Sequence, residues 1–320
     1  MTLEGGPRAG ARPDDAALRV RAVVDVPVDD LVPVGEGTRR SVAEDLRYVY
    51  GEGQPTDWLD AGPGRDYTTM IRAARAALTE RGLLDDVRLV LLVVTTPDLQ
   101  HERLLGGFVA DLFDGRPYTF CVTEQGLAGP FTALRLAHEE LRHGGPAGTG
   151  LGGSALVLVL EQCTLPPAPV RVPARDRVVA LVVGHDGPGR PVEALSVARA
   201  PRGARPAAPA ADAAPGAVLA ADAEPGVAPD ARRVVLGVDV DASAVTVLDG
   251  DVVLRADAGA AATGVWEVLA AHDGAAPGAS VVLLERCVEL GYRCSLALGP
   301  RTVREASPGA ADRAREAVLA

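Results

Sequence analysis

The segment Gly126–Ala137 reads GLAGPFTALRLA and lies where a predicted strand passes into a predicted helix. The preceding stretch Tyr118–Glu124 is rich in aromatic and β-branched residues, which is typical of a strand. Apolar residues then recur at helical spacing through Ala128–Arg142. The next apolar run, Ala155–Glu161, is short and nearly continuous, as in a strand buried on both faces. This alternation of strand and helix predicts an α/β fold.

The same order of elements occurs twice along the chain. Each copy has a buried strand, further strand signals, a helix that contains Ala-His, and a strand that closes on Leu-Glu-x-Cys. The matched segments are Val87–Thr95 with Val234–Val238, LRLAH (134–138) with VLAAH (268–272), and LVLEQC (158–163) with VLLERC (282–287). Agreement in order, type and spacing predicts two pseudo-symmetric halves, each a short mixed sheet with buried helices. Two such halves form a fold layered α-β-α-β-α.

Composition divides the chain into regions. The N-terminus is polar and rich in Gly, Pro and Arg, and one internal stretch is dominated by Ala, Pro and Asp, as in linkers. The run Val178–Gly184 is interpreted as the first strand of the second half. The predicted regions are a disordered N-terminus (1–17), a first half (18–175), a second half (176–300) with an insertion (201–229), and a polar tail (301–320).

Charge and residue usage exclude several classes of function. The net charge of −11 argues against nucleic-acid binding, which needs a basic surface. All 32 basic residues are arginines, so a Schiff-base lysine and a Walker-type phosphate lysine are excluded. The four cysteines are widely spaced without a C-x-x-C pair, so we predict no metal and no cofactor. Without a signal peptide or an apolar run of ~20 residues, we expect a cytoplasmic protein with no membrane contact.

The motif GLAGPFTALRLA resembles a known family. Its Ala128-Gly129 and Ala133-Leu134 match the nucleophile region of condensing enzymes of the β-ketoacyl-acyl-carrier-protein synthase III type, where a strand runs into Cys-Ala-Gly-Phe and then a helix with an Ala-Leu pair. The strand end TTPD (95–98) and the closing segment PGASVVLLERCVELGYRCSLAL (277–298) are also similar to that family. The resemblance covers residues 18–298 loosely, is weakest in 201–229, and implies a thiolase-like fold.

The resemblance also implies a catalytic triad that this chain lacks. Family members place a cysteine at the start of a buried helix, where the helix dipole stabilises its thiolate. A histidine and an asparagine, or two histidines, come from the second half. Those three positions hold Leu127, Gly237 and Ala262 here, so we predict a vacant catalytic site. The predicted pocket lining is Gln125, Leu127, Gly129 and Phe131.

Three residues remain as alternative catalytic groups. Cys121 lies six residues before Leu127, roughly 20 Å away along an extended strand, and we expect it to be a buried structural cysteine. Glu124 either lines the pocket beside Gln125 or is a polar strand end that meets solvent. His272 stands near the end of a helix, where histidines commonly contact the last carbonyls.

The family resemblance leaves three functions open. The first is a non-catalytic subunit of a bacterial polyketide or fatty-acid-type system, comparable to a chain-length factor, which pairs with an active ketosynthase through Tyr118–Glu124 and shapes its acyl pocket. The second is an active acyltransferase or condensing enzyme with a displaced catalytic group. The third is a scaffold that docks an acidic acyl carrier protein through Arg72, Arg75 and Arg81, unless these arginines only form a solvated helix face.

Overall fold

A computed structural model describes residues 17–62, 64–100, 104–143, 153–165, 171–199 and 230–302. The elements up to residue 184 are β1 (Arg19–Val26), α1 (Glu36–Tyr50), the 3-10 turn η1 (Asp57–Asp60), α2 (Tyr67–Glu80), β2 (Val87–Val94), α3 (Leu105–Leu112), β3 (Tyr118–Thr123), η2 (Gly126–Ala128), α4 (Gly129–His143), β4 (Ser154–Glu161) and β5 (Arg177–Gly184). Those that follow are β6 (Arg190–Arg199), β7 (Arg233–Leu236), η3 (Ala242–Ala244), β8 (Val252–Arg255), α5 (Gly264–Asp273), β9 (Val281–Cys287) and β10 (Tyr292–Leu298).

The strand order confirms the predicted internal repeat. The ten strands run β3-β2-β4-β5-β1-β6-β10-β9-β7-β8. When the second five are renumbered from one, both halves have the order 3-2-4-5-1. In each half the three strands farthest from the junction are parallel to one another. The two five-stranded sheets meet where β1 and β6 pair at Arg19↔Pro191 and Val20↔Arg190.

The boundary between the halves differs from the predicted position at residue 175. The run Val178–Gly184 was expected to open the second half, but β5 pairs with β1 on one side and β4 on the other. It therefore completes the first sheet, and the second half begins at β6. The apolar run has the same appearance in either sheet, because burial on both faces fixes its composition and not its partners.

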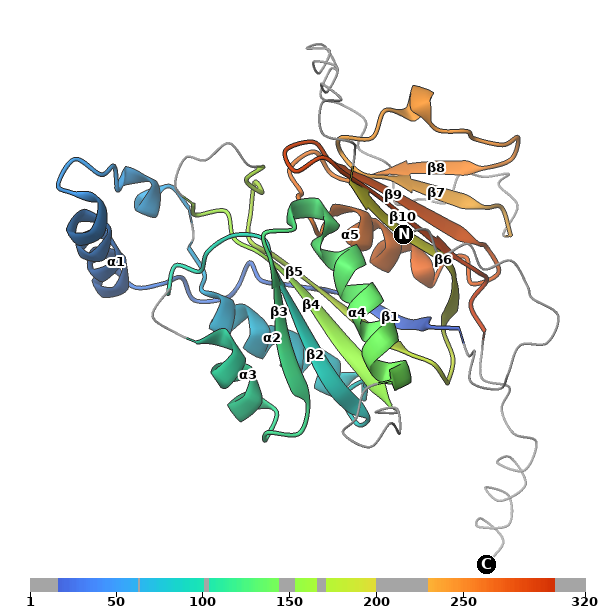
Figure 1. Ribbon diagram of the computed structural model, residues 1–320, viewed down its shortest axis with the longest axis horizontal. Coiled ribbons are helices and arrows are strands. Elements are labelled where there is room, and N and C mark those ends of the chain that lie inside the picture. The colour runs from blue at the N-terminus through green and yellow to red at the C-terminus, as the bar shows by residue number, and fades with distance from the viewer. Residues whose placement is uncertain are drawn as a thin grey trace, which may run out of the picture.

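The layers follow from which faces are apolar. Figure 1 shows α2 and α3 on the outer face of the first sheet, and α4 and α5 between the two sheets. Every residue of β4 and β5 is buried, since helices cover both faces of these strands. The core is built mainly of Val, Leu and Ala.

The helix α2 shows how the sequence sets one of these elements. The Asp66 carboxylate caps its N-terminus by accepting the backbone N–H of Thr69 at 2.8 Å. Ile71 and Leu78 lie on the buried stripe that the apolar spacing predicts. Gly82 follows the helix at a φ of 62°, a left-handed conformation that glycine adopts without strain.

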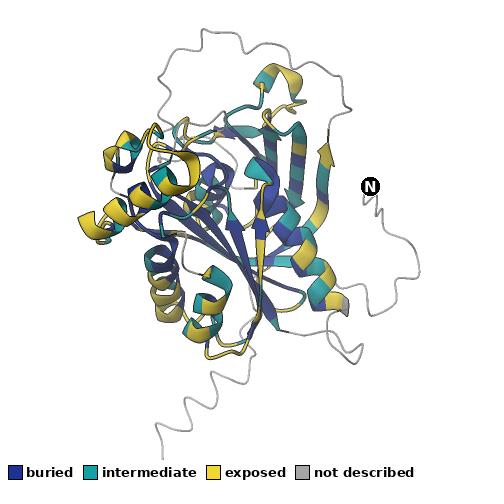
Figure 2. Cartoon of the chain, turned by 60° about the vertical axis from the view of Figure 1, so that its left-hand side comes forward, coloured by how far each residue is buried: buried dark blue, intermediate teal, exposed yellow. Residues whose placement is uncertain are grey.

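The second sheet is covered differently from the first. Buried residues alternate with half-buried ones along β9 and along most of β10 (Figure 2), so only the face toward α4 and α5 is fully packed. Within the described ranges no helix lies on the opposite face. The predicted insertion 201–229 falls outside the described residues, as do the N-terminal region before residue 17 and the tail after residue 302.

One predicted strand is shorter than expected. The sequence carries strand signals through Ala244–Leu254, but β8 begins only at Val252. The Asp251 carboxylate accepts the backbone N–H of Leu248 at 2.7 Å, and Gly250 has a φ of 90°. This turn breaks the strand, because a side chain satisfies the backbone in place of a ladder. None of the described helices is long and apolar enough to cross a membrane.

Candidate functional site

The turn between β3 and α4 carries the position at which the resemblance implies a nucleophile. Glu124 and Gly126 both have left-handed backbones, with φ of 57° and 50°. Leu127 follows and is 4% exposed. A Cβ on Gly129 would lie 2.6 Å from Cγ1 of Val93, so only glycine lets α4 start this close to β2. The family-like turn is present, with an apolar side chain at its centre.

Cys287, at the end of β9, lies against this turn. The backbone N–H groups of Leu127 and Leu290 lie near its sulfur and favour the thiolate. A Cβ on Gly126 would lie 3.0 Å from the same sulfur. The thiol in turn donates to Oε2 of Glu289 at 3.6 Å. Burial raises the pKa of Cys287 in spite of the two amides, which favour the thiolate, so the thiol is neutral at pH 7.

The space in front of Gly237 is filled by a carboxyl group. A Cβ placed on Gly237 would overlap the side chain of Glu285, which is 4% exposed. The backbone N–H of Arg286 donates to Oε1 of Glu285 at 2.8 Å. Burial raises the pKa of Glu285 to about 8, so this carboxyl is mostly protonated at neutral pH. A histidine side chain at position 237 would have to displace it.

The turn before α5, which holds Ala262, binds a second buried carboxyl. Glu161, fully buried at the end of β4, accepts the backbone N–H of Thr263 at 2.7 Å and that of Ala261 at 3.4 Å. These are amides at the start of a helix, where a carboxylate is favoured. Burial nevertheless raises the pKa of Glu161 to about 7. A residue of the first half therefore caps a helix of the second half.

The hydroxyl of Thr263 lies between the carboxyl groups of Glu161 and Glu267. Its Oγ1 is 3.0 Å from Oε2 of Glu161 and 2.8 Å from Oε1 of Glu267. One hydroxyl supplies one proton, so it can donate to only one of the two carboxyl groups at a time. Burial raises the pKa of both Glu161 and Glu267.

Two arginines balance the remaining carboxylates. Arg171 pairs with Asp239, which stands beyond Gly237 and further raises the pKa of Glu285. Arg177 pairs with Glu267 and donates to Oδ2 of Asp257 at 2.6 Å. Buried or half-buried acids and bases thus surround the place where the two halves meet. Such clusters supply proton donors and acceptors but no nucleophile.

The predicted pocket lining is packed core in this structure. Leu127, Gly129 and Phe131 are buried, and Gln125 is half-buried. The Phe131 ring lies 5.1 Å from that of Trp266, centroid to centroid, at an interplanar angle of 51°. This contact joins α4 to α5, and the same apolar cluster continues through both sheets.

The three alternative catalytic groups lie apart from one another. Cys121 is exposed on β3, opposite Leu92, so the expectation of a buried strand is wrong here. The reason is that β3 is the edge of its sheet. Glu124 is exposed at the turn, and Nδ1 of His272 lies 2.9 Å from the Val268 carbonyl at the end of α5.

Sequence reasoning missed Cys287, Glu161 and Glu285 as members of this site. The signal was present, because LVLEQC and VLLERC place a Glu and a Cys at matching ends of β4 and β9. In the sequence alone, that repeat indicates only a duplication. Among the described residues, no three or more His, Cys, Asp or Glu side chains are grouped so as to hold a metal ion.

Solved structures share the fold of this chain. The chain is similar to ChlB3, described as an acyltransferase (17% identity, 89% of this chain and 98% of that one, TM-score 0.53). It is similar to AbyA1, a tetronic acid condensing enzyme (16% identity, 88% of this chain and 99% of that one, TM-score 0.52). It is also similar to the priming β-ketosynthase of the R1128 polyketide biosynthetic pathway (17% identity, 91% of this chain and 99% of that one, TM-score 0.53).

No protein-family model and no curated protein matches the sequence. The structural likeness, at these identities, concerns the fold. Together with the repeated 3-2-4-5-1 strand order, it leads to one conclusion. The chain has an α/β fold of the thiolase type.

Proposed function

We propose that this chain is a non-catalytic ketosynthase-like subunit, which pairs with an active ketosynthase and shapes its acyl pocket in polyketide or fatty-acid-type biosynthesis. The observation that carries the proposal is the buried Leu127 at the strand–helix turn. The Glu285 carboxyl in the space before Gly237 supports it, because two roles of the triad are then filled by groups that cannot perform them. The framework around them is intact.

The edge strand β3 offers the surface for such pairing. Tyr118 and Phe120 are 53% and 48% exposed, and Cys121 is exposed beside them. An edge strand with apolar side chains and unpaired backbone groups readily pairs with another strand. Within the described residues β3 pairs with β2 alone.

The carrier-docking alternative has less support from the side chains. The Arg72 guanidinium lies 4.9 Å from the centre of the Phe108 ring, and Arg75 lies 6.0 Å from that of Phe113. These contacts pack α2 onto α3, so two of the three arginines already have a role within the fold.

Co-expression with a cysteine-bearing ketosynthase encoded beside this chain tests the proposal. We expect a one-to-one complex in size-exclusion chromatography with light scattering. Phe120→Asp should abolish it, because a carboxylate would be buried at the joined edges. Tyr48→Asp is the control, since Tyr48 is 91% exposed on α1, away from β3. A homodimer that ignores every such ketosynthase would overturn the proposal.

A second candidate function rests on Cys287. Its sulfur, between two backbone amides and Glu289, lies against the turn where the family nucleophile would stand. Here Glu289 would take the thiol proton, the sulfur would attack a thioester carbonyl, and the leaving thiol would recover the proton.

Intact-protein mass spectrometry after incubation with acyl thioesters separates the two candidates. For an acyltransferase we expect an adduct that Cys287→Ala removes and Cys121→Ala retains. Labelling should accelerate as the pH rises past 9, since burial raises the pKa of Cys287. A protein that gains no mass on Cys287 at any pH excludes this candidate and leaves the non-catalytic role.

A further inference from the structure

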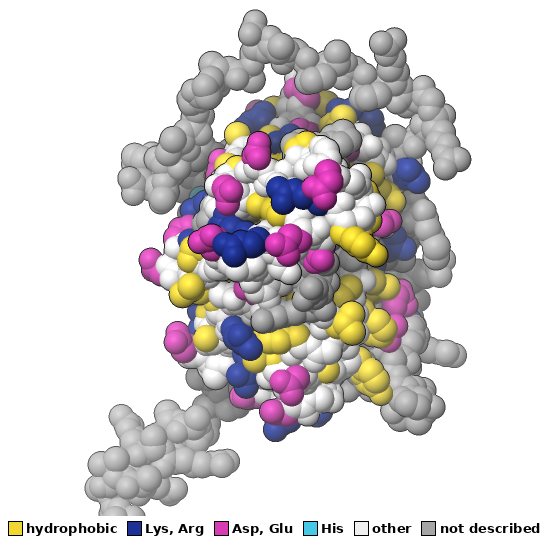
Figure 3. All heavy atoms as spheres, turned by 90° about the vertical axis from the view of Figure 1, so that its left-hand side faces the viewer, with side chains coloured by type: hydrophobic (Ala, Val, Ile, Leu, Met, Phe, Trp, Pro, Cys, Tyr) yellow, Lys and Arg dark blue, Asp and Glu magenta, His cyan; other side chains and the backbone are white. Residues whose placement is uncertain are grey.

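A pocket of 480 Å³ lies between α1 and the carboxyl ends of β2 and β4, and no residue of the turn at Leu127 lines it. Its walls come from α1, the stretch through Gln54 to Trp58, the loop Pro97–Leu99 after β2, and the loop Thr164–Leu165 after β4. Figure 3 views the side of the molecule that carries α1, where hydrophobic side chains reach the surface among charged ones. The volume lies within the range of sites that bind small molecules.

Its position in the fold is one at which α/β proteins bind ligands. β2 and β4 are parallel neighbours, and the chain continues from β2 to β3 on the opposite side of β2. The chain continues from β4 to its antiparallel neighbour β5, so the loops after β2 and β4 leave the sheet in opposite directions. Ligands of open α/β sheets bind outside the carboxyl ends of the strands.

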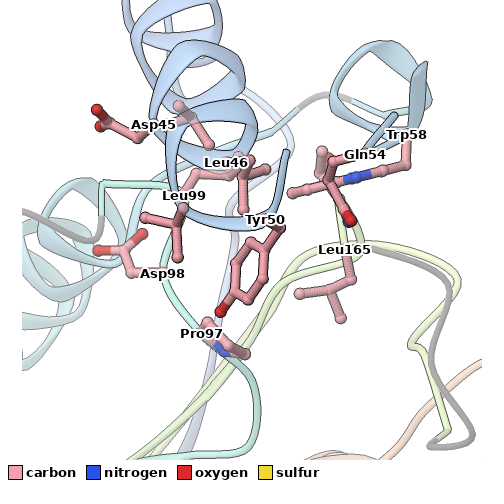
Figure 4. A pocket seen from close by; sticks show the side chains of 12 residues that line it. Asp45, Leu46, Tyr50, Gln54, Trp58, Pro97, Asp98, Leu99 and Leu165 are labelled. Carbon is pink, nitrogen blue, oxygen red and sulfur yellow. The ribbon is translucent and has the colours of Figure 1, made fainter. Parts of the chain in front are cut away.

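The chemistry of the lining is asymmetric. Figure 4 shows Trp58, Gln54 and Leu165 on one side and the carboxylates Asp45 and Asp98 on the other, with Tyr50 between them. The rest of the described lining is apolar apart from Thr164, and it contains no basic side chain.

One carboxylate oxygen of Asp98 has no hydrogen-bond partner among the described residues. Its Oδ1 accepts the backbone N–H groups of Tyr67 and Gln100, each at 3.2 Å. Its Oδ2 is buried and has no hydrogen-bond partner among the described residues. A buried acceptor without a partner is costly, and a donor on a bound molecule would satisfy it.

We propose that this pocket binds a neutral or cationic amphiphile, whose alkyl or aryl body lies against Leu46, Trp58 and Leu165 and whose hydroxyl or amine donates to Asp98. Anionic ligands are disfavoured, because an unpaired negative charge would enter a dry pocket beside carboxylates. The site is separate from the Leu127 turn, so the proposal does not depend on the function assigned to that turn.

Calorimetric titration of the whole chain with octylamine, octanol and octanoate tests the proposal. The titrations are run at pH 8, because burial raises the pKa of Asp98 and the carboxyl should be ionised. We expect octylamine to bind most tightly and octanoate at least about tenfold more weakly, the difference expected of a charge-assisted hydrogen bond. Asp98→Asn should lower octylamine affinity about tenfold and octanol affinity less, since an amide can donate to a hydroxyl.

Two tryptophan variants are designed to fill or block the pocket, and a third, placed elsewhere, is the control. Leu46→Trp occupies its interior, and Val49→Trp blocks it from a residue that is 65% exposed, so folding is less at risk. Both should abolish binding of all three probes. Leu136→Trp, on the exposed face of α4, should bind as the wild type does. Unchanged binding in a folded Val49→Trp protein would show adventitious adsorption and overturn the proposal, as would octanoate that binds as tightly as octylamine.

Discussion

The buried carboxyls Glu161 and Glu285 make folding stability depend on pH. Burial raises their pKa values to about 7 and about 8, from the ordinary 4.5 of glutamate. A folded state that holds a proton more tightly than the unfolded chain is most stable at low pH. That stability is lost as the pH rises from the unfolded pKa through the folded one. Each unit of pKa difference corresponds to about 1.4 kcal/mol.

We therefore expect the free energy of unfolding to fall between roughly pH 5 and pH 8. Glu161→Gln and Glu285→Gln should flatten this decline, because an amide does not titrate. Urea unfolding at several pH values measures the slope for each variant. Glu44→Gln, on the exposed side of α1, should keep the slope of the wild type. Equal slopes in all four proteins would contradict the assignment of the two protons.

At the scale of elements, the packing of α4 on β2 depends on Gly129. A methyl group there would lie 2.6 Å from Val93, closer than real Cβ contacts allow. We expect Gly129→Ala to destabilise the protein by about 1–3 kcal/mol, as overpacking does. Gly106→Ala, in α3, has nothing within 4 Å of the added Cβ and should stabilise by up to about 1 kcal/mol. Thermal unfolding of both variants checks the contrast, and a Gly129→Ala protein as stable as the wild type would refute it.

The elements also show what sequence can and cannot predict. Val87–Val94 and Ser154–Glu161 are recognisable because strands buried on both faces leave continuous apolar runs. The early end of the predicted strand 244–254 was not recognisable, since it depends on one hydrogen bond from the Asp251 carboxylate. Exposure of Cys121 was also missed, because edge position is a property of the sheet and not of the strand's own residues.

At the scale of the whole molecule, Arg177 ties the first sheet to the second half. Its guanidinium, 4% exposed, pairs with Glu267 and Asp257. Arg177→Met should lower the free energy of unfolding by about 3 kcal/mol, because Glu267 would be left buried without its cation. The double variant with Glu267→Met should recover part of that loss. Arg40→Met removes an exposed pair with Glu36 and should change stability by less than about 0.5 kcal/mol. Denaturant unfolding of these proteins provides the comparison, and equal losses at Arg177 and Arg40 would contradict it.

The two halves were foreseeable from the sequence, and the contents of their junction were not. The Leu-Glu-x-Cys repeat marks matching strand ends, and the strand order confirms that match. The Glu161 carboxyl binds amides before α5 across 100 or more residues of chain. Glu285 overlaps the space before Gly237, which lies 48 residues earlier in the chain. Local patterns contain no information about such contacts.

The face of the second sheet that no described helix covers offers a site for chemical labelling of this protein. The chain has no lysine, and Arg293 is exposed on the side of β10 that lacks a described helix. Arg293→Lys would supply a single ε-amine, so an amine-reactive dye would mark that face at one site besides the N-terminal amine. The fluorescence of the dye would then report whether any partner comes to rest on it.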